Sequence, residues 1–432
     1  MSFEAEIPTR RAHETLKVRG SLRLMFDPVF GPFFWGKLLS SAGTWIHSIV
    51  AVLLVFQLTG SAMVVGVVSI VQFAPQLLFA PLCGKMADRG NAPRQIVVGR
   101  LVTAFGSGGL AVWIWLVGGV GGLPGAAPVI AASLVVGVGF VVGGPALQSI
   151  VPSLVRPGEL AAAMVLNSVP MTVARAAGPA LGAVIATQMG YASAFAIAAS
   201  ASVIYGFLVL AMRLPRGCVN SSDTDFSVRA SLRHLRADPP LFLLLVGIAG
   251  VAIGADPSLT LAPTLAANLG GGAGLVGWLA SAFGIGAAIG FLFFGSLNRW
   301  LGLARLSSVG LILMAAGILA LVDSGTVALA IASFGVSGLG MTLAFTSITT
   351  QIQDRSPDAL RGRIMALWLV GFVGSRPLAA GLNGFLADAV SVDVALVATA
   401  VLVSLAASLC RPSRLRAPVY GPVRGPVTRD RA

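Results

Sequence analysis

The chain alternates between long apolar stretches and short polar gaps. Most of the apolar stretches are 18–28 residues long, and a helix of roughly 20 apolar residues crosses the hydrocarbon core of a bilayer. This length excludes the roughly ten-residue alternating strands of an outer-membrane barrel. The pattern therefore predicts an all-α membrane protein with twelve transmembrane helices. The segments lie near residues 30–57, 62–83, 95–119, 127–150, 160–187, 191–212, 239–264, 272–297, 305–322, 326–348, 363–387 and 393–410.

One long polar gap, residues 213–238, separates the sixth segment from the seventh. It predicts two six-helix bundles joined by a central loop. The polar arm before the first segment has neither the short apolar run nor the small-residue cleavage site of a signal peptide, so the first segment is expected to remain as a span. The expected divisions are an arm at 1–28, bundles at 29–212 and 239–410, the loop at 213–238 and a basic tail at 411–432.

The two halves of the chain carry an internal repeat. Residues that enter or lie within the fifth segment recur about 200 positions later, around the eleventh. The matched pairs are Pro157 with Pro357, Leu160 with Leu360, Arg175 with Arg376 and, elsewhere, Gly84 with Gly295. Repeated six-helix halves are typical of secondary transporters, whose substrate site lies between the repeats near the middle of the bilayer.

Composition supports a membrane protein, since 56% of residues are hydrophobic and only 10% are charged, against about 25% charged in soluble domains. The formal net charge of +13 first suggests a nucleic-acid partner. However, 26 of the 29 lysines and arginines lie in the tails, the even-numbered loops and their edges, where Lys85, Arg89, Arg94 and Arg100 are grouped together. By the positive-inside rule both termini are predicted to be cytoplasmic, and no nucleic-acid partner is expected.

Three stretches resemble the major facilitator superfamily and, within it, the branch of drug-efflux and enterobactin-exporter-like proteins. They are LLSSAGTWIHSIVAVLLVFQLTGSAMVVGVV at 38–68, GKMADRGNAPRQ at 84–95 and the region 144–182, which ends in ARAAGPALG. Together they place the resemblance over about residues 25–410. It implies the twelve-helix fold of this superfamily and transport by alternating access. A membrane-embedded enzyme is disfavoured, because the chain has only three histidines, no H-E-x-x-H sequence and few acidic residues inside its spans.

Two of these stretches imply roles for particular residues. Gly84, Asp88 and Arg89 match a loop motif whose family role is a cytoplasmic latch, although charges that only fix topology are the alternative. The second glycine and the basic pair of that motif do not align. In the fifth segment the antiporter-like residues suggest a hinge or an ion seal, or helix packing alone. They are Gly178, Pro179 and Gly182.

Three basic residues lie inside the spans. Arg175 and Arg376 are each about 15 residues into a span, too deep to reach the cytoplasmic surface, so they are expected to line a cavity or to bond a neighbouring helix. Lys37 is about one turn inside the first span and is expected to extend its amine to the cytoplasmic surface.

Two further ionisable residues, His47 and Asp256, lie in the first helices of the two halves and are candidates to carry a proton. The alternatives are a hydrogen-bonded interior histidine and an aspartate at a helix break marked by Pro257. Many relatives carry an aspartate beside the tryptophan of the first span, whereas this chain has Thr44 beside Trp45.

Other polar and aromatic residues in the spans are candidates to contact a substrate or, alternatively, to pack helices together. They are Trp45, Gln57, Gln72, Gln76, Gln148, Asn167 and Trp368.

These observations favour a proton-coupled exporter of small amphipathic molecules, drug-like or siderophore-like, in the inner membrane. A lysophospholipid flippase or an importer of the same fold remains open, and a non-transporting receptor is disfavoured by the short tails. No nucleotide-binding or metal-binding sequence is found, and three widely spaced cysteines favour neither a disulfide framework nor a zinc site. We expect no cofactor beyond a proton gradient and a monomer in the bilayer.

Overall fold

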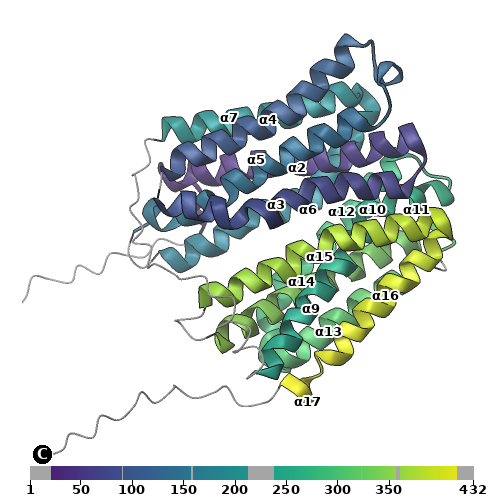
Figure 1. The fold of residues 1–432 in the computed structure, drawn as a ribbon. Coiled ribbons are helices and arrows are strands. Elements are labelled where there is room, and N and C mark those ends of the chain that lie inside the picture. Colours follow the sequence, from purple (N-terminus) through teal and green to yellow (C-terminus); the bar gives the residue numbers. More distant parts are fainter. Residues whose placement is uncertain are drawn as a thin grey trace, which may run out of the picture.

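Almost all of the chain outside the tails and the central loop folds into helices that run side by side (Figure 1). The computed structural model describes residues 21–89, 91–156, 159–212, 238–322, 324–356 and 361–415. These residues contain no β-strand. Eleven of their helices are long and apolar enough to cross a membrane, and a twelfth, Leu303–Leu319, is shorter but apolar. The predicted all-α fold with twelve spans is therefore confirmed.

The first half of the chain supplies six of the long helices. α2 packs on α6 and α7, α4 packs on α5 and α7, and α3 packs on α5. A short α1 precedes them, and two 3-10 turns, Val120–Gly122 and Val151–Leu154, flank α5. The bounds are α1 Ser21–Met25, α2 Phe30–Thr59, α3 Ala62–Arg89, α4 Ala92–Leu116, α5 Ala127–Ser149, α6 Leu160–Met189 and α7 Tyr191–Ala211.

The second half repeats this arrangement with one difference, a broken first helix. α9 packs on α14, α15 and α16, while α13 packs on α14 and α16. The predicted seventh span is divided into α9, α10 and α11, with Asp256 at the first break. The bounds are α9 Pro239–Ala255, α10 Pro257–Thr260, α11 Ala262–Asn268, α12 Ala273–Leu301, α13 Leu303–Leu319, α14 Val327–Arg355, α15 Arg361–Ala389, α16 Val392–Leu409 and α17 Pro412–Leu415.

The helix ends follow the local sequence. The side chain of Asn91 accepts a hydrogen bond from the Arg94 N–H at the start of α4, and Ser391 does the same for Val394 at the start of α16. Between α2 and α3 the chain reverses at Gly60, whose φ of 64° is readily adopted only by residues without a Cβ atom. The chain therefore turns within two residues between these spans.

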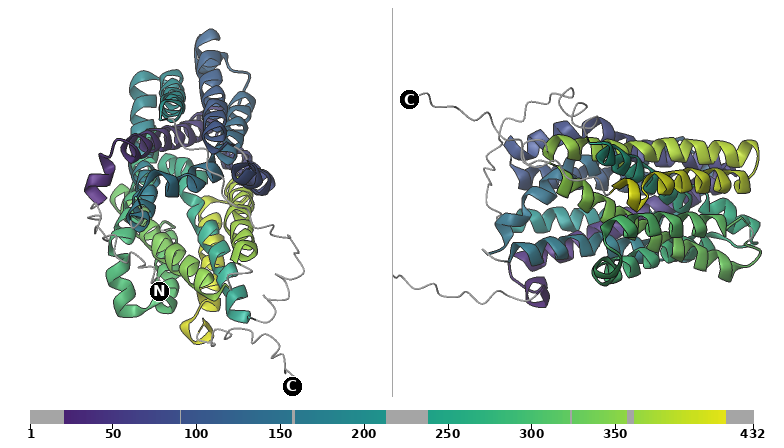
Figure 2. Two further views of the ribbon diagram at one scale, coloured as in Figure 1. Left: turned by 90° about the vertical axis from the view of Figure 1, so that its left-hand side faces the viewer. Right: turned by 90° about the horizontal axis from the view of Figure 1, so that it is seen from below.

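The two halves have distinct ends, which we name by charge. The described chain ends and the C-terminal ends of α3, α5, α7, α12 and α14 lie at one end, here called the basic end, and the C-terminal ends of α2, α4, α6, α13 and α15 lie at the other, the opposite end (Figures 1 and 2). The halves meet along two helix pairs, α3 with α15 and α6 with α12. Many large apolar side chains on the outer surface are exposed, as Phe105, Trp115 and Leu292 are, which suits a protein surrounded by lipid.

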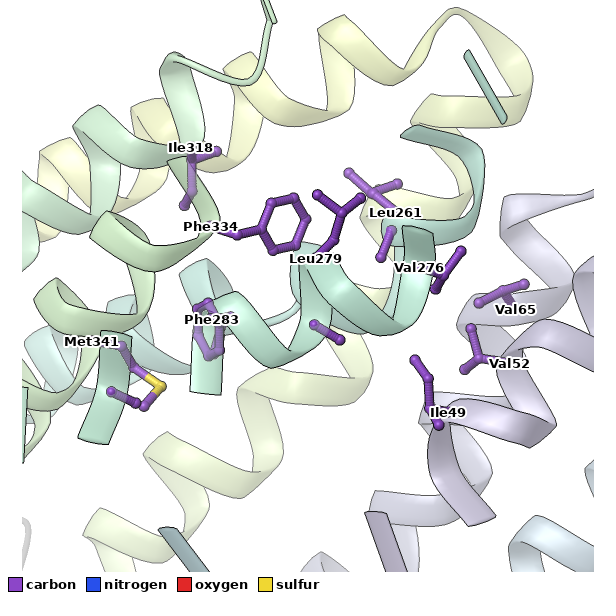
Figure 3. Close-up of a cluster of buried hydrophobic side chains, with 14 of the residues drawn as sticks. Ile49, Val52, Val65, Leu261, Val276, Leu279, Phe283, Ile318, Phe334 and Met341 are labelled. Atoms are coloured by element: carbon purple, nitrogen blue, oxygen red, sulfur yellow. The ribbon is translucent and has the colours of Figure 1, made fainter. Parts of the chain in front are cut away.

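An apolar cluster joins the halves near the opposite end. Ile49, Val52 and Val65 of the first half belong to the same buried cluster as Val276 and Leu279 of the second (Figure 3). At the basic end, by contrast, a second cluster around Phe30, Phe33 and Tyr205 is confined to the first half. The buried apolar contacts between the halves are therefore concentrated at the opposite end.

Candidate functional site

A cavity of about 550 Å³ lies between the two halves, toward the basic end. Its walls come from α2, α4, α5, α6 and α7 of the first half and from α12, α14 and α15 of the second. Pockets of about 300–1,000 Å³ are usual for small-molecule ligands. Apolar residues make up much of the lining, including Phe140, Leu147, Met171, Phe291, Met341, Phe345 and Phe372.

Near the mouth of this cavity the wall of the first half is polar. Lys37 donates hydrogen bonds from Nζ to the Asn167 backbone oxygen at 2.8 Å and to its Oδ1 at 2.5 Å. Asn167 in turn donates from Nδ2 to Gln148 Oε1 at 2.7 Å. Lys37 therefore does not extend to the surface as predicted, because a buried amide within reach supplies two acceptors. Gln148 and Asn167 do line the cavity.

Arg100, which was expected at the edge of the basic loop, also lines the cavity. It lies eight residues inside α4, is 4% exposed and donates from Nη1 to Ser40 Oγ at 2.8 Å. Tyr205 of α7 lies on the same wall and is fully buried. The position of Arg100 two turns inside an apolar helix was the signal that could have identified it from the sequence.

At the inner end of the cavity, here called the apex, arginines from both halves converge. Arg175 of α6 stacks over Trp45 at 5.2 Å and contacts Met341 Sδ at 3.4 Å. Arg376 of α15 stacks over Phe73 at 4.3 Å and reaches Phe372 at 5.7 Å. Both arginines line a small extension of the cavity, of about 50 Å³. The structure thus brings together the two residues that the internal repeat had paired.

The walls of this extension contain further residues predicted to contact substrate. Trp45, Gln72 and Gln76 line it together with Thr44. Gln72 donates from Nε2 to Ser48 Oγ at 2.7 Å, which also ties α3 to α2. Trp45 packs against Ala174 and, from the other half, Leu259 in a small buried cluster.

Two predicted substrate contacts lie elsewhere. Gln57 is exposed in the last turn of α2, at the opposite end of the molecule, where its Oε1 accepts a hydrogen bond from the Tyr191 hydroxyl at 2.6 Å. Trp368 stands behind the cavity wall, stacked on Phe372 at 5.7 Å and bonded from Nε1 to Thr349 Oγ1 at 3.1 Å. Neither side chain belongs to the cavity lining.

The antiporter-like residues of α6 make close helix contacts. A Cβ atom at Gly178 would lie 2.6 Å from the Cβ of Trp45, and one at Gly182 would lie 2.6 Å from the side chain of Ile49, so both glycines let α2 approach α6. Pro179 lacks the N–H that would bond the carbonyl of residue 175. A Cβ atom at Gly284 of α12 would lie 2.4 Å from that carbonyl oxygen, so the proline-containing turn of α6 packs tightly on the other half.

A side chain of the second half bonds the same turn of α6. Ser281 of α12 is 2% exposed, and its Oγ accepts a hydrogen bond from the Ala180 N–H at 2.9 Å. The turn after Pro179 is therefore held by the opposite bundle. This contact links the fifth and eighth predicted spans on the side of the cavity that faces the opposite end.

Asp388 makes a further polar contact between the halves, between α15 and α3. Its carboxylate accepts the N–H of Ala62 at 2.8 Å and of Met63 at 3.0 Å, and also bonds the Ser61 hydroxyl. A carboxylate is favourable at a helix N-terminus, where backbone N–H groups lack partners. The aspartate thus caps the first turn of α3 from the other half. The local sequence around Asp388 carries no sign of this role, because its partners lie more than 320 positions away.

His47 lies in the core of the first bundle rather than in the cavity. It is fully buried, with Nδ1 3.0 Å from Ser107 Oγ and Nε2 3.5 Å from Ser133 Oγ. Its ring packs edge-on against Phe195 at 5.2 Å. Both of these polar contacts are with hydroxyl groups of its own bundle, as expected for the hydrogen-bonded interior histidine.

Asp256 lies at the break between α9 and α10 and is 6% exposed. Its carboxylate accepts hydrogen bonds from Asn383 Nδ2 at 2.7 Å and from Thr260 Oγ1 at 3.0 Å. The Thr399 hydroxyl donates to Asn383 Oδ1 at 2.7 Å, which orients that amide. Arg376 is close enough to interact electrostatically with Asp256. Arg376 precedes Asn383 by seven residues, so the two side chains lie two turns apart on the same face of α15.

The predicted latch lies largely outside the described residues. Gly84 belongs to α3, and the space around its Cα is open. The side chains of Asp88 and Arg89 lie outside the described part of the chain. The latch therefore stays a prediction.

A family model for transmembrane secretion effectors, within the major facilitator superfamily, matches residues 21–419. The chain belongs to this family. Curated relatives include the enterobactin exporter EntS of Salmonella choleraesuis (strain SC-B67), 26% identical over 373 residues that cover 84% of the chain and 86% of the relative. The enterobactin exporter EntS of Citrobacter koseri is 29% identical over 352 residues, which cover 78% and 77%.

Solved structures share the fold of this secretion-effector chain. A bacterial homologue of the lysosomal transporter Spinster matches with a TM-score of 0.69 at 16% identity, over 90% of the chain and 96% of that structure. A bacterial homologue of the iron transporter ferroportin gives 0.70 at 16%, over 91% and 98%. A D-xylose–proton symporter gives 0.68 at 14%, over 90% and 97%. The chain is thus a multi-pass membrane transporter of the major facilitator fold.

Proposed function

We propose that the protein exports small amphipathic molecules across the inner membrane by alternating access, coupled to the proton gradient. The observation that carries this proposal is the cavity between the halves, which lies toward the basic end while the halves are joined at the opposite end. Rocking two six-helix halves about a central site is the usual mechanism in this class of fold.

The direction in which the cavity opens follows from charge. Lys and Arg are concentrated in short cytoplasmic loops of membrane proteins, so the basic end is assigned to the cytoplasm. The structure then corresponds to an inward-facing state, in which cargo enters from the cytoplasm. The contacts made by Asp388 and Ser281 close the outer side and must break when the transporter opens outward.

The chemistry of the cargo is inferred from the lining and from the relatives. Aromatic and methionine side chains suit an apolar body, and the polar and basic side chains in the same lining suit a polar head. The curated relatives are enterobactin exporters, which favours a siderophore-like cargo and export. Import, or flipping of a lysophospholipid through the same cavity, is the alternative that a measurement of direction decides.

Asp256 is the proposed proton carrier. It is a carboxylate at a helix break inside the membrane, and broken helices in transporters commonly form substrate or ion sites. Arg376 links it electrostatically to the apex of the cavity. Loss or gain of one proton at Asp256 therefore changes the net charge next to the site where the two halves meet.

Everted membrane vesicles from a strain that lacks its own exporters test this proposal. Vesicles that contain the protein should accumulate enterobactin, or an amphipathic antibiotic from a panel, when respiration acidifies their interior. Collapse of the pH gradient should stop this uptake. Uptake by right-side-out vesicles instead would show import, and no gradient-dependent movement of any compound in either orientation would contradict the proposal.

A further inference from the structure

The charges that line the cavity are all of one sign. Among the described residues that line it and its apical extension, the side chains that are charged at neutral pH are Lys37, Arg100, Arg175 and Arg376, and none is Asp or Glu. Unpaired cations inside a membrane are costly, and they usually have a counter-charge or a function. The structure places four cations around a space large enough for a small molecule.

The two arginines at the apex have no carboxylate within ion-pair distance among the described residues. Arg175 contacts a ring and a thioether sulfur, and Arg376 contacts two rings. Asp256 attracts Arg376 but is itself bonded to Asn383 and Thr260 and does not line the cavity. Stacking on aromatic faces orients a guanidinium while its N–H edge remains available for a planar anion.

Unpartnered hydrogen-bond donors lie in the same walls. Trp45 Nε1 in the apical extension has no partner among the described residues, although the side chain is only 9% exposed. Arg100 Nε and the Tyr205 hydroxyl, on the wall nearer the mouth, are buried without partners as well. Buried polar groups nearly always find a partner, so a ligand with acceptor atoms is expected to supply one in the occupied state.

We propose that the cargo is an amphipathic organic anion whose acidic group binds between Arg175 and Arg376, one arginine from each half, with the apolar body in the main cavity. The Trp45 indole N–H adds a donor at the same place, and the cations near the mouth attract the anion on entry. The inference rests on the proposed function and specifies the chemical class of its cargo.

An anion bound at the apex also offsets the positive charges of Arg175 and Arg376, which lie close together when the halves are in contact on the outer side. Without it, Arg175 and Arg376 repel each other across the seam between the halves. An anion that contacts both arginines stabilises the inward-facing arrangement, because each half then contributes one charge-assisted hydrogen bond. Cargo binding is thereby connected to the contact between the halves.

Three fluorescent probes with one apolar body test this charge selectivity in the full chain reconstituted in phosphatidylcholine nanodiscs. They are pyrene-1-sulfonate, neutral pyrene-1-sulfonamide and pyrenylmethylammonium, with empty nanodiscs to correct for partition into lipid. Hydrogen bonds to charged groups lead us to expect at least about tenfold tighter binding of the sulfonate than of the sulfonamide. Equal affinities, or a preference for the ammonium probe, would overturn the proposal.

Variants separate the apex from general attraction. R175Q and R376Q together should reduce the preference for the sulfonate to about twofold or less, and measurable binding of the sulfonamide shows that the protein is folded. R175K with R376K should retain most of the preference. R299Q is the matched control, because Arg299 is exposed at the basic end of α12 and outside the cavity. An unaltered preference in the double glutamine variant would contradict an apical site.

Two further arms identify the source of the anion and separate this inference from the proposed function. If phosphatidylglycerol added to the nanodiscs displaces pyrene-1-sulfonate, the recognised anion is a lipid headgroup rather than a soluble acid. If proteoliposomes bind the sulfonate selectively but move none of the probes, the proposed transport fails and the charge class stands. If they transport the ammonium probe in preference, transport stands and the anion class fails.

Discussion

The two halves place an ionisable residue at the same position of their first helix and give it opposite surroundings. His47 and Asp256 each lie 17 residues after the start of their helix, about 25 Å along the axis. α2 continues unbroken past His47, whose polar contacts among the described residues are with Ser107 and Ser133 and whose ring packs against Phe195. The helix of Asp256 ends there.

The difference teaches that depth in a span does not by itself indicate function. His47 is neutral in one of its two common forms and is satisfied by hydroxyl groups, so it can be a packing residue of the core. Asp256 accepts hydrogen bonds from the Asn383 amide and the Thr260 hydroxyl. It also interacts electrostatically with Arg376, which lines the apex of the cavity, so a change in the charge of Asp256 acts on a residue of the cavity wall. The environment, rather than the residue type, separates the two assignments.

Replacing Asp256 by Asn should have the largest effect on transport driven by the pH gradient. If it had none, the contrast drawn between Asp256 and His47 would be wrong. The amide keeps the size of the side chain but cannot exchange a proton, so flux driven by a pH gradient should fall at least about tenfold, or about 1.4 kcal/mol in the barrier. The measurement is initial uptake in everted vesicles. D393N, at an exposed site in the first turn of α16, is the matched control and should transport normally. Gradient-driven flux retained in D256N would remove Asp256 as the carrier.

Replacing Asn383 by Leu should have the next largest effect. The change removes the shorter of the two hydrogen bonds to the buried Asp256 carboxylate and removes the acceptor of the Thr399 hydroxyl. We expect a loss of about 1–3 kcal/mol in the free energy of unfolding and a shifted pH dependence of transport. Denaturant unfolding in detergent and pH profiles in vesicles measure the two effects. A pH profile identical to that of the wild type would show that the hydrogen bonds of Asn383 with Asp256 and Thr399 do not affect proton coupling.

Replacing His47 by Leu should affect stability alone. The substitution removes the hydrogen bond to Ser107 and the packing against Phe195, at a cost of about 1–3 kcal/mol. Transport per folded molecule, and its dependence on the pH gradient, should equal those of the wild type. Loss of gradient-driven flux in a folded H47L protein would return His47 to the candidates for proton transfer.

A pair of single-hydroxyl removals should have the smallest effects and the sharpest contrast. Ser107→Ala and Thr399→Val each delete one hydrogen bond, worth about 0.5–1.5 kcal/mol. Only the threonine change, which acts on the partner of Asp256, should move the pH dependence of transport. Equal pH profiles in both variants would show that the amide of Asn383 needs no support from Thr399.

Local sequence was sufficient for the spans and for much of the site. The lengths of the apolar segments predicted the twelve helices, and the repeat paired Arg175 with Arg376, which the structure brings to one apex. The expected positions of Arg100 and Lys37 were wrong, because a neighbouring helix supplies each of them with an acceptor, Ser40 for Arg100 and Asn167 for Lys37. Asp388 carried no local signal at all.

The sequence by itself thus determined which segments enter the membrane and how the basic residues are distributed along the chain, since hydropathy and charge act residue by residue. The tertiary structure alone decided which ionisable side chains share a space. His47 and Ser107 are 60 positions apart, Asp256 and Asn383 are 127, and Ala62 and Asp388 are 326. Such pairs form only when helices pack, because hydrogen bonds and charges act over a few ångströms of space rather than along the chain.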